Sequence, residues 1–132
     1  MEVLSSRVLL SPQDLERSVR WYVDTLGLRI AREFGIDGRR TGVVLFLGGG
    51  FLELSGAARP AGAADASATP VALWLQVHDV DEEHERLHRA GAVASGPETM
   101  PWGLRELWLR DPDGHRIVLV EVPEDHPLRR RL

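Results

Sequence analysis

The chain has 132 residues, enough for one domain with a buried core, and its 43% hydrophobic and 27% charged residues are typical of globular proteins. The net charge of −4 gives no electrostatic reason to expect nucleic acid, and the absence of cysteine excludes disulfides and thiolate metal sites. The sequence shows no signal-peptide pattern and no apolar run of about 18 residues. We therefore expect a cytoplasmic protein without a membrane partner.

The first predicted elements are a strand over Val3–Leu10 and a helix after it. Ser11 can cap this helix, Pro12 suits its first position because proline lacks the N–H, and Asp14 completes a capping box. Gly27 suits the stop. Apolar side chains recur at helical spacing along one face: Leu15, Val19, Tyr22, Val23 and Leu26. Three strands should follow: Leu28–Phe34, Gly42–Leu47 and Phe51–Ser55.

The second half of the chain repeats this order after a segment that reads as a linker, Gly56–Thr69, rich in Ala, Gly, Pro and Ser. Pro70–Val77 is a predicted strand, Asp79 can cap a second helix, and Gly91 can end it. The remaining predicted elements are a short strand over Ala92–Ser95, a hairpin of Leu104–Leu109 and Arg116–Val120 around Asp111-Pro112-Asp113-Gly114, and a polar tail over Pro123–Leu132.

One offset of 65 residues relates the two halves. It places Asp14 on Asp79 and Leu54 on Leu119. A constant offset that joins a helix start to a final strand indicates an internal repeat. We therefore predict an α+β fold of two βαβββ modules in tandem within a single domain, residues 1–132, with module one at about 1–56, a linker at about 57–69, module two at about 70–122 and a tail at 123–132. Their sheets would form a curved mixed sheet around a ligand cup, with the helices outside.

Several motifs carry a resemblance to a known family: Asp14–Ser18 leading to Trp21-Tyr22 and Leu26-Gly27-Leu28, the helix entry Val77–Asp81, and Arg105-Glu106 with Asp111-Pro112-Asp113-Gly114. In these the chain resembles the vicinal oxygen chelate superfamily, which contains glyoxalase I, bleomycin-resistance proteins and extradiol dioxygenases. The resemblance covers about Val3 to Val122 and is more specific for fold than for function.

The resemblance implies that enzymes of this superfamily hold a divalent metal at the positions of Arg7, Glu53, Ala72 and Val118. Only Glu53 can ligate, because arginine has no lone pair to offer and the other two side chains have no donor atom. One carboxylate cannot form a transition-metal site. We therefore expect no metal and no cofactor.

Three histidines lie around the second predicted helix, where His84 and His88 spell the H-E-x-x-H pattern of zinc proteases. In this fold that helix lies outside the sheet, so we interpret His78, His84 and His88 as surface or helix-face residues. Arg7 and Glu53 should both point into the cup. They would form an ion pair there, or one of them would bind a polar group of a ligand.

Strand alternation predicts the lining of the cup. The predicted ligand-binding residues are Arg7, Leu9, Phe51, Glu53, Trp74, Gln76, Trp102, Arg116 and Val118. Trp74 and Trp102 are expected to contact ligand because indole offers a flat surface with one polar N–H, and Trp102 should lie on a loop at the mouth of the cup. Trp21 and Trp108 are expected in the core.

We therefore predict a metal-free binding protein of the bleomycin-resistance type, with no catalytic residues, which sequesters an aromatic or planar natural product or antibiotic. The resemblance implies a homodimer. The alternative is a glyoxalase-like lyase or isomerase, or a dioxygenase. It would use acid–base chemistry at Glu53, or a displaced metal held by Glu53 and either Glu106 or Glu121, with or without Gln76. A third possibility is a structural or regulatory dimer whose cup is filled by its own side chains. The sequence leaves open the ligand, the role of the arginine-rich tail, and whether modules pair within or between chains.

Overall fold

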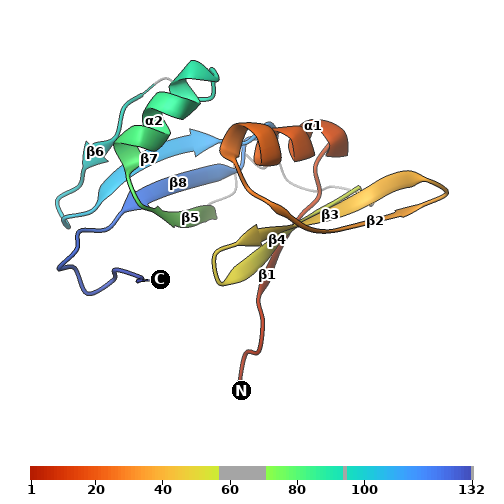
Figure 1. Cartoon of the computed structure of the whole chain (residues 1–132), viewed down its shortest axis with the longest axis horizontal. Coiled ribbons are helices and arrows are strands. Elements are labelled where there is room, and N and C mark those ends of the chain that lie inside the picture. The colour runs from red at the N-terminus through yellow and green to blue at the C-terminus, as the bar shows by residue number, and fades with distance from the viewer. Residues whose placement is uncertain (57–70, 94, 132) are drawn as a thin grey trace. The chain divides into compact units, whose positions relative to one another are not determined.

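A computed structural model describes residues 1–56, 71–93 and 95–131, and it contains two compact units, Met1–Asp65 and Ala66–Leu132. Each unit follows the order strand, helix and three strands and forms one four-stranded mixed sheet (Figure 1). The predicted α+β fold of two tandem βαβββ modules is confirmed. The predicted linker over residues 57–69 lies outside the described residues.

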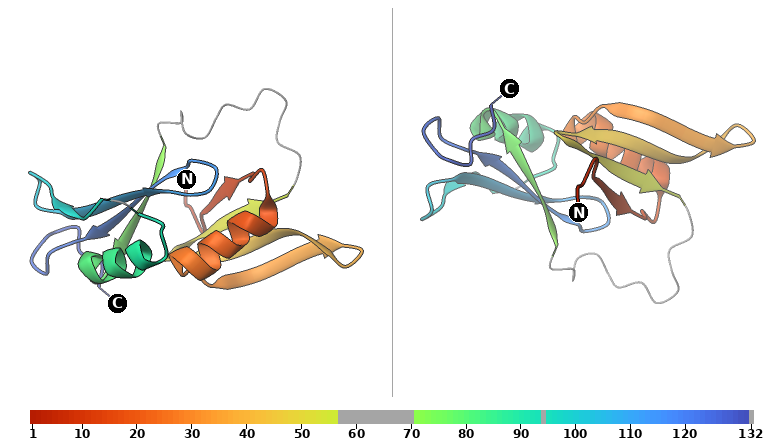
Figure 2. Two further views of the ribbon diagram at one scale, coloured as in Figure 1. Left: turned by 90° about the horizontal axis from the view of Figure 1, so that it is seen from above. Right: turned by 90° about the horizontal axis from the view of Figure 1, so that it is seen from below.

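Unit one is built on a sheet with strand order β1-β4-β3-β2, called sheet A here. Strand β1 runs parallel to β4, and the other neighbours are antiparallel. Both views of Figure 2 show β2 and β3 as a long two-stranded ribbon. The elements are β1 Arg7–Leu10, α1 Leu15–Arg20, the π-helix η1 Trp21–Leu26, β2 Ile30–Ile36, β3 Arg39–Leu47 and β4 Gly50–Ser55.

The first helix begins later than its sequence signals predict. Asp14 is its N-cap, with an extended backbone and a carboxylate that accepts a hydrogen bond from the Arg17 N–H at 3.1 Å. Ser11 and Pro12 therefore precede the helix, because the Asp14 carboxylate closes the first turn. Gly27 ends the helical segment with φ of 96°, as predicted. The predicted helix face packs on sheet A, where Val19, Tyr22 and Leu26 are buried with Val43, Leu45, Leu52 and Leu54.

Unit two is built on sheet B, with strand order β5-β8-β7-β6 and a parallel β5–β8 pair. Asp79 caps its helix by accepting from the Glu82 N–H at 3.0 Å, as predicted, and Gly91 follows the helix with φ of 73°. The predicted strand over Ala92–Ser95 is wrong in its described residues, because the short strand that pairs with β7 lies further on. The elements are β5 Ala72–Val77, α2 Val80–Arg89, β6 Glu98–Thr99, β7 Arg105–Arg110 and β8 Arg116–Glu121.

Alternation along the strands divides sheet B into two faces. Helix α2 packs on one of them through Val80 and Leu87, both fully buried, and Figure 1 shows it lying along β7 and β8. Five strand residues complete this core: Leu73, Leu107, Leu109, Ile117 and Leu119. The alternate residues of each strand point to the opposite face. The predicted site residues on the strands of module two lie on that face.

Each unit contains its own ion pair between a helix and a strand, and the two pairs match at the repeat offset of 65 residues. In unit two, Arg105 donates to both carboxylate oxygens of Asp81, at 2.9 and 2.7 Å. In unit one, Arg40 donates to both oxygens of Glu16, at 3.0 and 2.6 Å. Arg40 lies 65 positions before Arg105, and Glu16 lies 65 positions before Asp81. Each pair ties the first turn of a helix to a strand. These hydrogen bonds lower the pKa of Asp81 and of Glu16, and they raise the pKa of each arginine.

The helices in the described part of the chain include none that is long and apolar enough to cross a membrane.

Candidate functional site

The best candidate for a binding surface is the face of sheet B opposite α2, called the tryptophan face here. Trp74 on β5 and Trp108 on β7 both pair with Val118 of the strand between them. Paired residues project to the same side of a sheet, so the two indoles flank Val118. They are 47% and 46% exposed, whereas Val118 is buried. This row therefore presents two aromatic surfaces on an apolar floor.

The floor continues along β8 beneath the tryptophans. Val118, Val120, Val122 and Leu104 form one buried apolar cluster. Val118 is therefore placed where it supports the two rings and offers little surface of its own. Arg116, one alternation before Val118, carries its guanidinium 5.7 Å from the centre of the Trp108 ring. Such a cation over an indole is an attractive contact, and it helps to fix the orientation of that ring.

A buried carboxylate lies in the next row of the same face. Glu106 pairs with Val120 and is only 7% exposed. One of its oxygens accepts the indole N–H of Trp108 at 3.0 Å, and the other accepts the indole N–H of Trp102 at 3.0 Å. Trp102 belongs to the turn before β7 and is 57% exposed. Three tryptophans therefore gather on this face, and two of them share one anion.

The predicted polar group Gln76 lies in the row of Glu106 and Val120, at the β5 edge of the sheet. Its side-chain amide donates to the carbonyl of Arg130 at 3.2 Å and accepts from the Arg130 N–H at 3.0 Å. Both hydrogen-bonding atoms of the amide are thus used by the C-terminal segment. Any ligand that uses Gln76 has to compete with this segment.

The predicted residues of module one also share a single face, on sheet A. Strand register places Arg7 beside Phe51, and Leu9 beside Glu53. Arg7 donates to Glu53 at 2.8 Å and lies 5.9 Å over the Phe51 ring, which in turn packs 5.9 Å from Phe46. The predicted ion pair is present. It lies beside two aromatic rings, so this surface combines a charged pair with an apolar patch.

The family metal positions do not supply the donor atoms that a metal needs. Glu53 is paired with the cation of Arg7, and Ala72 and Val118 offer no donor. Among the displaced candidates, Glu121 lies on the α2 face of sheet B and so points away from Gln76 and Glu106. Glu106 already accepts two indole N–H groups. The residues present therefore do not fit a divalent metal of the family type.

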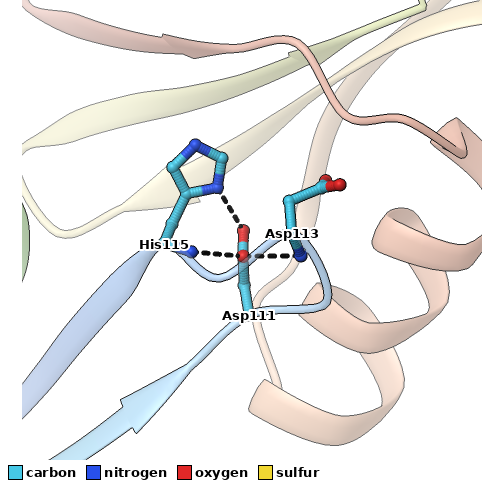
Figure 3. A group of neighbouring side chains, drawn as sticks. All are labelled: Asp111, Asp113 and His115. Carbon is cyan, nitrogen blue, oxygen red and sulfur yellow. Dashed lines mark hydrogen bonds and ion pairs between the residues drawn. The ribbon is translucent and has the colours of Figure 1, made fainter. Parts of the chain in front are cut away.

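Two other groups in the described residues have carboxylate or imidazole atoms close together: Asp79, Asp81 and Glu121, and Asp111, Asp113 and His115. Figure 3 shows the second group in the β7–β8 turn. One Asp111 oxygen accepts the backbone N–H groups of Asp113 and His115 at 2.9 and 2.8 Å, and the other lies 2.8 Å from Nδ1 of His115. The carboxylate therefore organises the predicted turn, which Gly114 closes with φ of 90°.

The histidines of α2 lie where the sequence interpretation expects them. His84 is half-buried and His88 is exposed, and their rings are 5.6 Å apart. Neither belongs to a cluster of metal-capable groups in the part of the chain that the structure describes. The H-E-x-x-H pattern is a helix-face feature.

Sequence reasoning missed two residues of the tryptophan face. Trp108 was expected in the core, and this is wrong, because its register with Val118 places it half-exposed beside Trp74. The interpretation of Glu106 as a displaced metal ligand does not predict its hydrogen bonds to two indoles. Finding Trp108 requires the register of the last hairpin, which the repeat predicts one residue off. Nothing in the residue pattern indicates that Trp102 reaches Glu106.

A family model described as Glyoxalase: Glyoxalase/Bleomycin resistance protein/Dioxygenase superfamily matches residues 5–119. The chain belongs to this superfamily. The match spans both modules, so the resemblance inferred from the motifs is confirmed.

Solved structures give the same fold. TioX from Micromonospora sp. ML1 is 28% identical, with a TM-score of 0.72, over 89% of this chain and 97% of that one. A superfamily member from Sphaerobacter thermophilus DSM 20745 is 30% identical, with a TM-score of 0.65, over 92% and 98%. TnmS3 from Streptomyces sp. CB03234, described as an antibiotic binding protein, is 24% identical, with a TM-score of 0.69, over 93% and 100%.

Proposed function

We propose that this protein binds a planar aromatic small molecule non-covalently and sequesters it, releasing it chemically unchanged. The observation that carries the proposal is the row Trp74–Val118–Trp108, in which two half-exposed indoles stand on one apolar floor. Adjacent strands are about 4.8 Å apart, so the two backbone positions are separated by about 10 Å. That span suits a ligand of two or three fused rings.

Two further observations support binding over catalysis. The donor atoms at the family metal positions do not fit a metal, and the carboxylate on the tryptophan face is engaged by indole N–H groups. Large flat side chains in an apolar surround with a few polar groups are typical of small-molecule sites. The antibiotic binding described for TnmS3 adds a precedent on the same fold for an antibiotic as the ligand class.

We propose that the protein acts in the cytoplasm as a homodimer, as its family resemblance implies, with no nucleic-acid partner. Light scattering of purified protein tests the assembly. A mass equal to one chain at all concentrations would contradict the dimer and leave the ligand proposal standing.

Binding is tested by calorimetric titration of the full chain against a panel of planar polycyclic natural products and antibiotics. Saturable binding is expected, followed by quantitative recovery of the ligand with an unchanged mass after long incubation. Recovery of a modified product would overturn sequestration in favour of an enzyme. Failure of every planar compound to bind, with binding of a flexible non-aromatic one, would overturn the ligand class.

A further inference from the structure

We propose that Glu106 is a positioning residue, which fixes the orientation of the Trp102 and Trp108 indoles. In this orientation a ligand can stack on the ring faces but cannot hydrogen-bond to the ring N–H groups. The inference rests on the proposed function and deepens it, because it assigns a specificity determinant to the tryptophan face. Its basis is one buried carboxylate whose two oxygens each accept one indole N–H at 3.0 Å.

Glu106 is much more buried than the two indole rings that bond to it. Glu106 is 7% exposed beneath two rings that are 46% and 57% exposed. The hydrogen bonds to the two indoles are part-buried, and the rings themselves are too exposed for packing alone to fix them. A buried carboxylate is costly unless it is hydrogen-bonded, and an apolar residue would fill the same position beside Val120 more cheaply. The carboxylate is therefore best explained by what it does to the rings.

The backbone around Glu106 determines which indoles can reach its carboxylate. Glu106 and Trp108 are two residues apart on β7 and so project to the same face. Trp102 reaches the same carboxylate from a tight turn that is closed by the Met100 N–H on the Leu104 carbonyl, at 2.8 Å, and by Gly103 at φ of 90°. The anion thus couples a strand residue to a turn residue. It sets the orientation of both rings before any ligand arrives.

Two consequences for the ligand follow. Ordering the rings in advance removes part of the entropy that binding would otherwise cost. Because both N–H edges are occupied, a hydrogen-bond acceptor on the ligand gains nothing from Trp102 or Trp108. The preferred ligand at this face is therefore a flat ring system that stacks through its π surface, and a bent or puckered analogue of similar size should be disfavoured.

The first test needs no ligand. In ¹H–¹⁵N NMR spectra of the full chain, the indole N–H signals of Trp102 and Trp108 should exchange with solvent more slowly than that of half-exposed Trp74. Glu106→Gln keeps the size of the side chain but leaves one acceptor oxygen, and it should speed exchange at one or both indoles. Glu121→Gln is the matched control, a carboxylate of the same sheet on the α2 face. Fast exchange at both indoles in the unmodified protein would overturn the inference, even if the Gln variant fails to fold.

The second test uses acridine and its bent reduced form, 9,10-dihydroacridine, as probes. Glu106→Gln should weaken acridine binding by roughly three- to tenfold and narrow the preference for acridine over the reduced form, while Glu121→Gln changes neither. Equal affinity and equal preference in the Glu106→Gln protein would overturn the positioning role and leave the proposed function intact. If neither probe nor any planar compound binds the unmodified protein, the proposed function fails, and the exchange data still decide whether Glu106 orders the rings.

Discussion

Trp74 and Trp108 face the same side of sheet B because both pair with Val118, one from each neighbouring strand. They are 34 residues apart in the sequence and separated by one buried side chain in the fold. This relationship converts two separate aromatic residues into one surface. Ligand binding is therefore expected to depend on this pairing of the two tryptophans with Val118.

Metal removal should leave binding unchanged. Since Arg7, Ala72 and Val118 supply no ligand atom and Glu53 is bonded to Arg7, protein treated with a chelator should bind planar ligand with the same Kd as untreated protein. Metal analysis after addition of Zn, Fe, Mn or Ni should find less than one equivalent retained. A stoichiometric metal that is lost in Glu53→Gln would show that the displaced-metal alternative is correct.

The contact between Gln76 and Arg130 should control the mobility of the C-terminal segment. Gln76→Ala removes both hydrogen bonds to the Arg130 backbone, so tryptic cleavage in the segment 129–131 should become several times faster. Cleavage at Arg39, beside the β2–β3 turn, provides the internal reference. Equal tail cleavage rates in both proteins would mean that these bonds do not hold the segment.

Acid should weaken the ion pair of Arg105 and Asp81 in a defined pH window. The pKa of Asp81 is lowered by the hydrogen bonds from Arg105, so its stabilising effect is present above the ordinary aspartate pKa and disappears as the pH falls through the lowered value. The free energy of unfolding of Asp81→Asn should therefore lie below that of the natural protein at pH 7, and the gap should close below about pH 4. Urea unfolding at pH 7, 5 and 3 measures this. A gap that widens in acid would contradict the assignment.

Gly42 should not tolerate a side chain, because a Cβ there would lie 2.1 Å from Cζ of the Phe34 ring on the paired strand. Gly42→Ala should lower the free energy of unfolding by about 1–3 kcal/mol, since an overpacked ring has to move. Gly49→Ala is the matched control, because nothing lies within 4 Å of its added carbon. Equal denaturation midpoints for the two variants would show that Phe34 moves aside at little cost.

The repeat explains why the fold was predictable from sequence and part of the site was not. An offset of 65 transfers the caps Asp14 and Asp79 and the register of each parallel strand pair correctly. The same offset predicts the pairing of the last two strands, β7 and β8, with an error of one residue. Val43 pairs with Leu54 in unit one, but Trp108 pairs with Val118 rather than Leu119 in unit two. A shift of one residue turns a side chain to the other face, and so Trp108 leaves the core.

Other differences have local causes. Ser11 and Asp14 both offer a side-chain oxygen at the same helix start, and the backbone geometry shows that Asp14 closes it. The bonds of Gln76 and Glu106 depend on partners that a strand pattern does not place: a tail residue 54 positions away and a tryptophan in a turn. Alternation predicted which face Gln76 occupies. Alternation does not predict that the Gln76 amide hydrogen-bonds to the backbone of Arg130.

The central claim is that the tryptophan face binds a planar ligand, and the most direct measurement is a calorimetric titration of that ligand into Trp74→Ala, Trp108→Ala and Trp21→Ala. Trp21 lies on η1 against Tyr22 and serves as the control. Loss of either Trp74 or Trp108 should weaken binding by about 1 kcal/mol or more, roughly fivefold in Kd, while Trp21→Ala leaves it unchanged where the variant is folded. Undiminished affinity in both Trp74→Ala and Trp108→Ala would show that the ligand binds elsewhere.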